Sequence, residues 1–247
     1  MIEPSLFHQM GEYAALDKND VVLDVGAGLG FLTRFLANRC GRVLAVEADH
    51  RLAGVLREQL EGLDNVELTE GNVLKAQIPQ FNKVVAIPPY QISSQLVTWL
   101  FSREHVCAVL VFQKEFVNRL VAPIGSEDYG WLTVLSYHNG ECELLDDVPK
   151  SMFFPQPKID SIIIRLTPRQ AKPFALKDEV LFRRLLQSLF TQRNRKVRNA
   201  VLPFLKGIRR KTAEEATKRA DALPFRDRRV RELAPEDFGE LAHALSD

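Results

Sequence analysis

Cysteine is scarce in this chain of 247 residues, and its three cysteines, Cys40, Cys107 and Cys142, form no CxxC pair. We therefore expect neither a disulfide framework nor a zinc site, and a reducing cytoplasm is the natural setting. Long apolar runs are also missing, because none approaches the roughly 20 residues that a membrane-spanning helix needs. The opening residues, Met1-Ile-Glu-Pro-Ser-Leu-Phe-His8, lack the basic and apolar segments of a secretory signal. The sequence thus predicts a cytoplasmic protein with no membrane span and no metal.

Charge is unevenly distributed along the chain, although its net value is only +1. From Arg183 to Arg231 there are 16 Lys and Arg residues against 4 Asp and Glu, whereas the rest carries 17 basic and 28 acidic residues. A basic segment attached to an acidic body predicts a polyanionic partner for that segment alone. A solvated helical surface would give the same count, so both interpretations stay open at this point.

Short apolar runs alternate with helical patterns through the first two thirds of the chain. Five runs read as buried strands: 21–25, 42–46, 66–69, 83–87 and 107–112. Helical patterns over 31–39, 50–60 and 92–101 separate them. This alternation predicts an α/β fold with a mostly parallel, Rossmann-like sheet and helices on both faces. Residues 132–145 and 159–166 read as later strands, added antiparallel at one edge.

The pattern changes after Thr167-Pro168. Residues 177–190 form an amphipathic helical pattern, and the helical periods beyond it are broken by Pro203, Pro224 and Pro235. We therefore predict two domains, 1–171 with the sheet and 172–247 as a small all-helical domain.

A glycine-rich turn, Asp24-Val-Gly26-Ala-Gly28-Leu-Gly30, closes the first predicted strand and opens a helix. Glycines allow a tight turn and a close approach of a ligand to the backbone. Glu47 ends the second predicted strand, 17 residues after Gly30, where a carboxylate can accept both hydroxyls of a ribose. NAD and S-adenosylmethionine both carry such a ribose, so these residues alone do not separate the two, and a glycine turn without a ligand is a further alternative.

The end of the fourth predicted strand distinguishes between NAD and S-adenosylmethionine as the expected cofactor. Its residues are Ile87-Pro88-Pro89-Tyr90. Prolines fix φ and remove N–H donors, so a backbone carbonyl there can face a pocket and accept a hydrogen bond from an exocyclic amine. The tyrosine ring can stack on a flipped base. A dehydrogenase does not need such a corner, whereas an amino-group methyltransferase needs it to hold the amine. A simple turn with a core tyrosine is the alternative.

Several longer motifs resemble a known family. They are Val22-Leu-Asp-Val-Gly-Ala-Gly-Leu-Gly-Phe-Leu-Thr33, Val46-Glu-Ala-Asp49, Pro89-Tyr-Gln-Ile-Ser-Ser94, Phe112-Gln-Lys-Glu115, Gly125-Ser-Glu-Asp-Tyr-Gly130, Phe153-Phe-Pro-Gln-Pro-Lys-Ile-Asp-Ser161 and Phe190-Thr-Gln-Arg-Asn-Arg-Lys196. Together they resemble the KsgA-type small-subunit rRNA adenine dimethyltransferases, and the resemblance covers nearly the whole chain. The residues within the motifs look most similar to those of archaeal members. The related erythromycin-resistance methylases share the earlier motifs, but the last two favour the ribosome-biogenesis branch.

The resemblance implies an activity and a set of site residues. The family transfers two methyl groups from S-adenosylmethionine to the N6 of each of two adjacent adenosines in small-subunit rRNA. By this resemblance Tyr90 and Phe153 pack on the two faces of the target base, with Ile87, Pro88 and Pro89 completing the catalytic corner. The expected cofactor-binding residues are Asp24, Gly26, Gly28, Gly30, Glu47, Ala48, Asn72, Val73 and Ile87. Asn72 stands where the family has an Asp for the adenine amine, and it offers the same oxygen acceptor without the charge.

Two features depart from the family pattern. Ile87 occupies the position of the family's catalytic Asn, whose amide accepts a hydrogen bond from the adenine amine. Losing one such positioned group costs on the order of 10²–10³-fold in rate, by analogy with an oxyanion-hole donor. The family's opening Gln-x-Phe-Leu segment, which touches the cofactor, is not found before Met1-Ile-Glu-Pro4. A truncated sequence or a misplaced start would explain this, and if the absence is natural we expect weaker cofactor affinity.

Basic residues of the helical part would contact RNA phosphates, which supply affinity without sequence information. The expected RNA contacts are Arg193, Arg195, Lys196 and Arg198, with further basic clusters at 209–211 and 226–231. We expect small-subunit rRNA in a pre-30S particle as the partner and a monomeric protein. The leading hypothesis is an rRNA adenine-N6 methyltransferase; the second is a ribosome-assembly factor whose methylation is weak because of Ile87; a NAD-linked dehydrogenase is the third.

Overall fold

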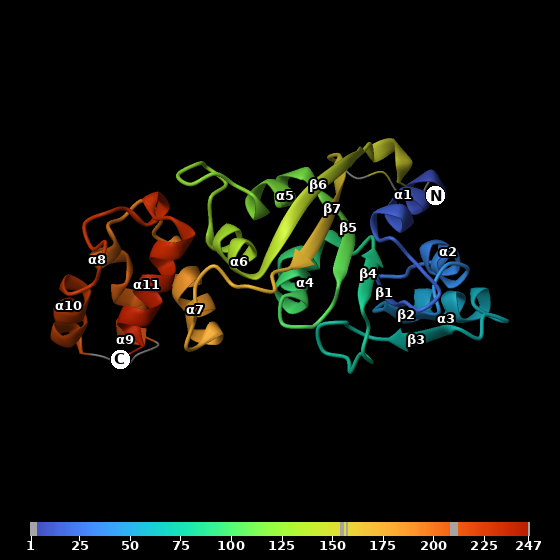
Figure 1. Ribbon diagram of the computed structural model, residues 1–247, viewed down its shortest axis with the longest axis horizontal. Coiled ribbons are helices and arrows are strands. Elements are labelled where there is room, and N and C mark those ends of the chain that lie inside the picture. Colours follow the sequence, from blue (N-terminus) through green and yellow to red (C-terminus); the bar gives the residue numbers. More distant parts are fainter. Residues whose placement is uncertain (1–3, 154–155, 157, 208–211, 247) are drawn as a thin grey trace. The chain divides into compact units, whose positions relative to one another are not determined.

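The computed structural model describes residues 4–153, 156, 158–207 and 212–246. The chain forms two compact units (Figure 1). The sheet unit comprises Met1–Val117 and Gly140–Pro168, and the helical unit comprises Asn118–Asn139 and Arg169–Asp247. The predicted ranges 1–171 and 172–247 differ from these units, because residues 118–139 leave the sheet after its fifth strand and join the helical unit.

A seven-stranded sheet with the order β3-β2-β1-β4-β5-β7-β6 forms the centre of the sheet unit. Its strands are β1 (Val21–Val25), β2 (Arg42–Glu47), β3 (Val66–Glu70), β4 (Lys83–Ala86), β5 (Cys107–Gln113), β6 (Gly140–Val148) and β7 (Ser161–Pro168). The first five pair in parallel, whereas β7 runs antiparallel to β5 and β6 antiparallel to β7. The predicted fold class, a mostly parallel Rossmann-like sheet with an antiparallel edge, is therefore confirmed.

Helices pack on this sheet through their apolar sides. The sheet unit contains α1 (Pro4–Tyr13), α2 (Phe31–Ala37), α3 (His50–Gln59), η1 (Tyr90–Ile92), α4 (Ser93–Leu100) and η2 (Lys150–Met152), and α5 (Lys114–Leu120) follows β5. One cluster of buried side chains joins α1 and α2 to one sheet face; we call it the α1 cluster, and it includes Leu6, Phe7, Met10, Leu32, Leu36, Val85, Val109 and Ile163. Burial of such side chains supplies the main stabilisation of this layer.

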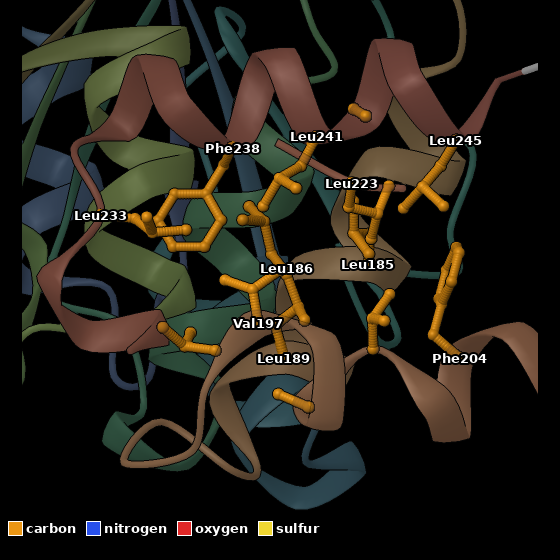
Figure 2. Close-up of a cluster of buried hydrophobic side chains, with 14 of the residues drawn as sticks. Leu185, Leu186, Leu189, Val197, Phe204, Leu223, Leu233, Phe238, Leu241 and Leu245 are labelled. Carbon is orange, nitrogen blue, oxygen red and sulfur yellow. The ribbon is translucent and has the colours of Figure 1, made fainter. Parts of the chain in front are cut away.

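The helical unit has a core of its own. Its elements are α6 (Trp131–Asn139), α7 (Glu179–Phe190), α8 (Val197–Ala200), α9 (Leu202–Gly207), α10 (Ala213–Asp221), η3 (Val230–Glu232) and α11 (Pro235–Leu245). Figure 2 shows Leu185, Leu186 and Leu189 of α7 directed at side chains of α11 and neighbouring elements. Helix α7 begins at Glu179, and the preceding Asp178 is its N-cap, because its carboxylate accepts the Leu181 N–H at 2.9 Å.

One sequence expectation about the elements is wrong. Residues 132–145 read as a strand, but Trp131–Asn139 is helix α6 and only Gly140–Val148 is a strand. Seven of the nine residues of α6 are buried, so no polar stripe marks a helix, and an apolar run of this length fits either element.

Two kinds of feature are absent from the described residues. No helix in the described part of the chain is long and apolar enough to cross a membrane. No group of three or more His, Cys, Asp or Glu side chains in the same residues could hold a metal ion. The predicted basic cluster at 209–211 lies outside the described residues.

Candidate active site

The glycine-rich turn closes β1 and leads into α2. Gly26, Gly28 and Gly30 have φ of 76°, 57° and 82°, the left-handed region in which glycine alone is free of strain. The turn is held against β2, because the N–H groups of Gly26 and Ala27 donate to the Val46 carbonyl at 2.8 and 3.1 Å. The backbone path of this turn therefore favours glycine at all three positions.

Gly26 also brings the glycine turn against the Pro-Pro-Tyr corner that follows β4. A Cβ atom at Gly26 would lie 2.7 Å from Cδ of Pro89, closer than real Cβ contacts come. The strands β1 and β4 are neighbours and parallel, so both turns leave the same edge of the sheet. Residues some 60 positions apart in the sequence therefore form one site, as expected for the carboxyl edge of a doubly wound sheet.

Glu47, the last residue of β2, is fixed by two backbone donors. Its Oε2 accepts the Gly28 N–H at 2.8 Å and its Oε1 accepts the Asp49 N–H at 2.9 Å. The residue is only 8% exposed, while its neighbour Ala48 is exposed. Each carboxylate oxygen keeps a second lone pair, so the pair can still accept two hydroxyl groups of a ligand.

Asp24 lies beneath the glycine turn and is buried. Its Oδ2 accepts the Thr33 hydroxyl at 2.7 Å, which links β1 to α2. Burial raises the pKa of Asp24 to about 7, the Thr33 hydrogen bond opposes this shift, and the negative charge of Glu47 adds to it. The side chain is thus held inside the fold below the turn.

The turn after β3 carries Asn72 and Val73. The Gly71 N–H donates to the Glu47 carbonyl at 2.7 Å, which fixes this turn beside β2. Asn72 is exposed and its Oδ1 accepts the Leu74 N–H at 2.9 Å, whereas Val73 is buried. The Asn72 oxygen retains one lone pair toward solvent, which is the acceptor expected for an adenine amine.

Ile87, Pro88 and Tyr90 form the corner after β4. Ile87 is half-buried and packs against the α1 cluster, as Phe153 does. Pro88 is buried, and among the residues that the structure describes none donates a hydrogen bond to its carbonyl. The Tyr90 hydroxyl lies 2.8 Å from the Ser161 hydroxyl, and burial raises the pKa of Tyr90. Sequence reasoning gave Ser161 no role, because nothing in the pattern signals a contact across 71 positions.

Two basic segments of the helical unit lie side by side. Backbone hydrogen bonds of 2.9–3.1 Å join Arg193–Arg198 to Arg226–Arg231 in antiparallel order. We call these two segments the basic ridge; they carry eight Lys and Arg residues and one Asp. The first and third predicted basic clusters are therefore one surface.

The cations of the ridge have different partners. Arg193 donates to the Ser126 and Glu127 carbonyls, and Arg229 to the Asn194 carbonyl, so both guanidinium groups hold the unit's own backbone. Lys196 and Arg198 lie 3.5 and 3.3 Å from Asp227, whose pKa is lowered because these cations outweigh desolvation. Arg195 is exposed, and no interaction of its side chain is found among the described residues.

Comparison with known proteins gives consistent relatives. A family model described as ribosomal RNA adenine dimethylase matches residues 1–225. The probable ribosomal RNA small subunit methyltransferase A of Methanosarcina acetivorans is 36% identical over 236 residues, covering 95% of this chain and 86% of that protein. That of Thermococcus kodakarensis is 36% identical over 247 residues, covering 99% and 87%.

Solved structures agree with these relatives. A dimethyladenosine transferase from Plasmodium falciparum has a TM-score of 0.81 at 27% identity, covering 98% of this chain and 95% of that one. The 23S rRNA methyltransferase ErmE has a TM-score of 0.66 at 30% identity, covering 99% and 98%. The resemblance inferred from the motifs is confirmed: this chain belongs to the ribosomal RNA adenine dimethylase family, and it is an rRNA adenine methyltransferase.

Proposed function

We propose that this protein transfers methyl groups from S-adenosylmethionine to the N6 amines of adjacent adenosines in small-subunit rRNA. The observation that carries the proposal is the contact between Gly26 and Pro89, which joins the glycine turn to the Pro-Pro-Tyr corner. The two archaeal relatives are named as small-subunit methyltransferases, which supports the small subunit as substrate.

The residues of the glycine turn fit S-adenosylmethionine. Glu47 presents two carboxylate oxygens with free lone pairs, which suits the two ribose hydroxyls. Gly26, Gly28 and Gly30 would line the methionine end, and Asn72 and Val73 the adenine. When bound, the cofactor supplies an electrophilic methyl group on its sulfonium.

The corner would hold and activate the target amine. The Pro88 carbonyl has no donor among the described residues and would accept a hydrogen bond from the adenine amine. This hydrogen bond would turn the lone pair of the amine nitrogen toward the methyl donor. The rings of Tyr90 and Phe153 would hold the flipped base. With the amine and the donor aligned, proximity supplies much of the rate, since no covalent intermediate is needed.

The basic ridge is the surface that we propose for RNA. Three of its cations, Lys196, Arg198 and Arg226, share the single carboxylate of Asp227, so the local charge stays positive. Phosphate contacts from such a surface give salt-dependent affinity, and specificity then comes from RNA shape and an accessible adenosine.

The proposal is tested by transfer of labelled methyl from S-adenosylmethionine to small subunits that lack the modification. We expect incorporation that depends on both the cofactor and the subunits. Absence of label above background, with subunit binding intact, would contradict the proposal.

A second candidate is a ribosome-assembly factor with weak or lost methylation. The observation in its favour is Ile87, which packs against the α1 cluster and offers no acceptor to the amine. Ile87→Asn separates the two candidates. A gain on the order of 10²-fold in methylation would favour a disabled site, and little gain would favour a working corner that uses Pro88.

A further inference from the structure

We propose that Ser161 and its neighbour Asp160 are positioning residues that fix the two aromatic side chains for the target base. The inference rests on the proposed function, in which the rings of Tyr90 and Phe153 hold the target base. It adds two residues that act through those rings without touching the reacting atoms themselves.

Ser161 is held between two strands at the start of β7. It is the first residue of β7, is 0% exposed, and pairs with Gln113 of β5 on one side and Val148 of β6 on the other. A residue with strands on both sides has little freedom to move, and a buried hydroxyl requires a partner. Its partner is the Tyr90 hydroxyl at 2.8 Å.

Tyr90 is thereby held at both ends. Its backbone follows the two prolines, whose φ is fixed, and its carbonyl accepts the Ser93 hydroxyl at 2.8 Å. Its hydroxyl, at the far end of the side chain, meets Ser161. Two fixed ends leave the ring one orientation, which is what a stacking surface for a base requires.

Asp160 holds the second ring through a turn. Its Oδ1 accepts the Lys150 N–H at 2.9 Å, at the first residue of η2. The Phe153 N–H in turn donates to the Lys150 carbonyl at 3.2 Å, and the Met152 N–H to that of Pro149 at 3.0 Å. Asp160, the residue before Ser161, therefore holds the turn that carries Phe153. The positions of both rings thus depend on residues at the start of β7.

Ser161→Ala tests the first link. We expect kcat for methyl transfer to fall about 10-fold, because a misplaced ring spoils the alignment, while the Kd of S-adenosylmethionine stays unchanged. Tyr90→Phe keeps the ring and removes the same hydrogen bond, so it should have a similar effect, and the double variant should fall no further. Ser136→Ala, which removes another buried serine hydroxyl in α6 of the helical unit, is the matched control and should leave kcat unchanged.

Asp160 is tested by two substitutions that differ in one acceptor. Asp160→Asn keeps an oxygen for the Lys150 N–H and should leave kcat within about 2-fold of wild type, whereas Asp160→Ala should lower it about 5-fold. Equal values for the two variants would overturn the role of Asp160.

Crystal structures of wild type and Ser161→Ala give a readout that does not depend on activity. We expect one Tyr90 rotamer in wild type and a displaced or divided ring in the variant. If wild type methylates RNA but Ser161→Ala has wild-type kcat and ring position, the positioning role is wrong while the proposed function stands. If wild type transfers no methyl group, the proposed function fails, and the Tyr90 rotamers still decide whether Ser161 holds the ring.

Discussion

The sheet unit and the helical unit use their polar side chains for different tasks. In the sheet unit the site depends on backbone geometry. Gly26 has no side chain to clash with Pro89, and Glu47 is oriented by two backbone N–H groups. In the helical unit the long cations of the basic ridge bridge to backbone carbonyls and carboxylates of their own unit. A site for a small cofactor needs fixed atoms, whereas a phosphate surface needs only charge in roughly the right place.

This difference predicts how each unit responds to substitution. Changes in the sheet unit should act through geometry and lower activity steeply, because the site was assembled by close approach. Changes on the basic ridge should act in small steps, and they should divide into those that affect folding and those that affect RNA binding.

The largest effect is expected from Gly26→Ala. The new Cβ would need a strained φ of +76° and would lie 2.7 Å from Pro89 Cδ, so the turn and the corner must separate. We expect methyl transfer to fall more than about 100-fold and the free energy of unfolding by about 1–3 kcal/mol. Gly54→Ala is the control, since nothing lies within 4 Å of that position in α3 and the helix should gain about 0.5–1 kcal/mol. Near-normal transfer by Gly26→Ala would break the link between turn and corner.

Two buried titrating groups, one in each unit, make opposite contributions to the pH dependence of stability. The pKa of Asp24 is raised to about 7, so above about pH 4 the native protein binds more protons than the unfolded protein. The contribution of Asp24 to stability is therefore lost as pH rises toward 7. His138, 2% exposed beside Phe174 and Phe182, has its pKa lowered by burial to about 4. Its contribution is lost as pH falls from about 6.5 to 4, by up to about 3 kcal/mol.

Urea unfolding of wild type, Asp24→Asn and His138→Phe between pH 4 and 7 measures these contributions. The stability difference between wild type and Asp24→Asn should fall as pH rises, and the difference between wild type and His138→Phe should grow. Parallel pH profiles of the three proteins would contradict the assignment.

A smaller effect is expected from Glu47→Gln. The amide has one oxygen, so it cannot accept from both the Gly28 and Asp49 N–H groups and also serve a ribose. Calorimetry should show the Kd of S-adenosylmethionine rising about 10- to 100-fold. The same substitution at Glu67 of β3, which is half-buried and paired with Arg42, should leave the Kd unchanged. Equal affinities for wild type and Glu47→Gln would remove Glu47 from the cofactor site.

The smallest effect distinguishes two neighbours on the basic ridge. Arg193→Ala breaks hydrogen bonds to the Ser126 and Glu127 carbonyls and should cost about 1–3 kcal/mol of stability. Arg195→Ala should leave stability within about 0.5 kcal/mol but raise the Kd for RNA about 3- to 10-fold, with a salt slope lower by about 1. Loss of stability in Arg195→Ala without a change in RNA binding would reverse the two roles.

Much of the fold could be predicted from local patterns. The strands β1, β2 and β5 are apolar runs buried on both faces, and their spacing with helices indicates a parallel sheet. Helix α6 could not be predicted, because its residues are buried nearly all round. The grouping of residues 118–139 with the helical unit also has no local signal, since it depends on where the chain leaves β5 and returns to β6.

The candidate site divides in the same way. Gly26, Gly28 and Gly30 carry their signal in the sequence, because a left-handed backbone selects glycine. The contact of Gly26 with Pro89, the hydrogen bond of Tyr90 to Ser161 and the use of Arg193 for loop carbonyls all join distant segments. Such contacts follow from tertiary packing, which composition and periodicity do not encode.

Nucleoside analysis of the RNA tests the central claim most directly. Small subunits lacking the modification are incubated with the protein and S-adenosylmethionine, and the digested rRNA is examined by mass spectrometry. We predict N6,N6-dimethyladenosine among the nucleosides, and its loss with Gly26→Ala but not with Gly54→Ala. Unmodified adenosine throughout, from subunits that the protein demonstrably binds, would contradict the account.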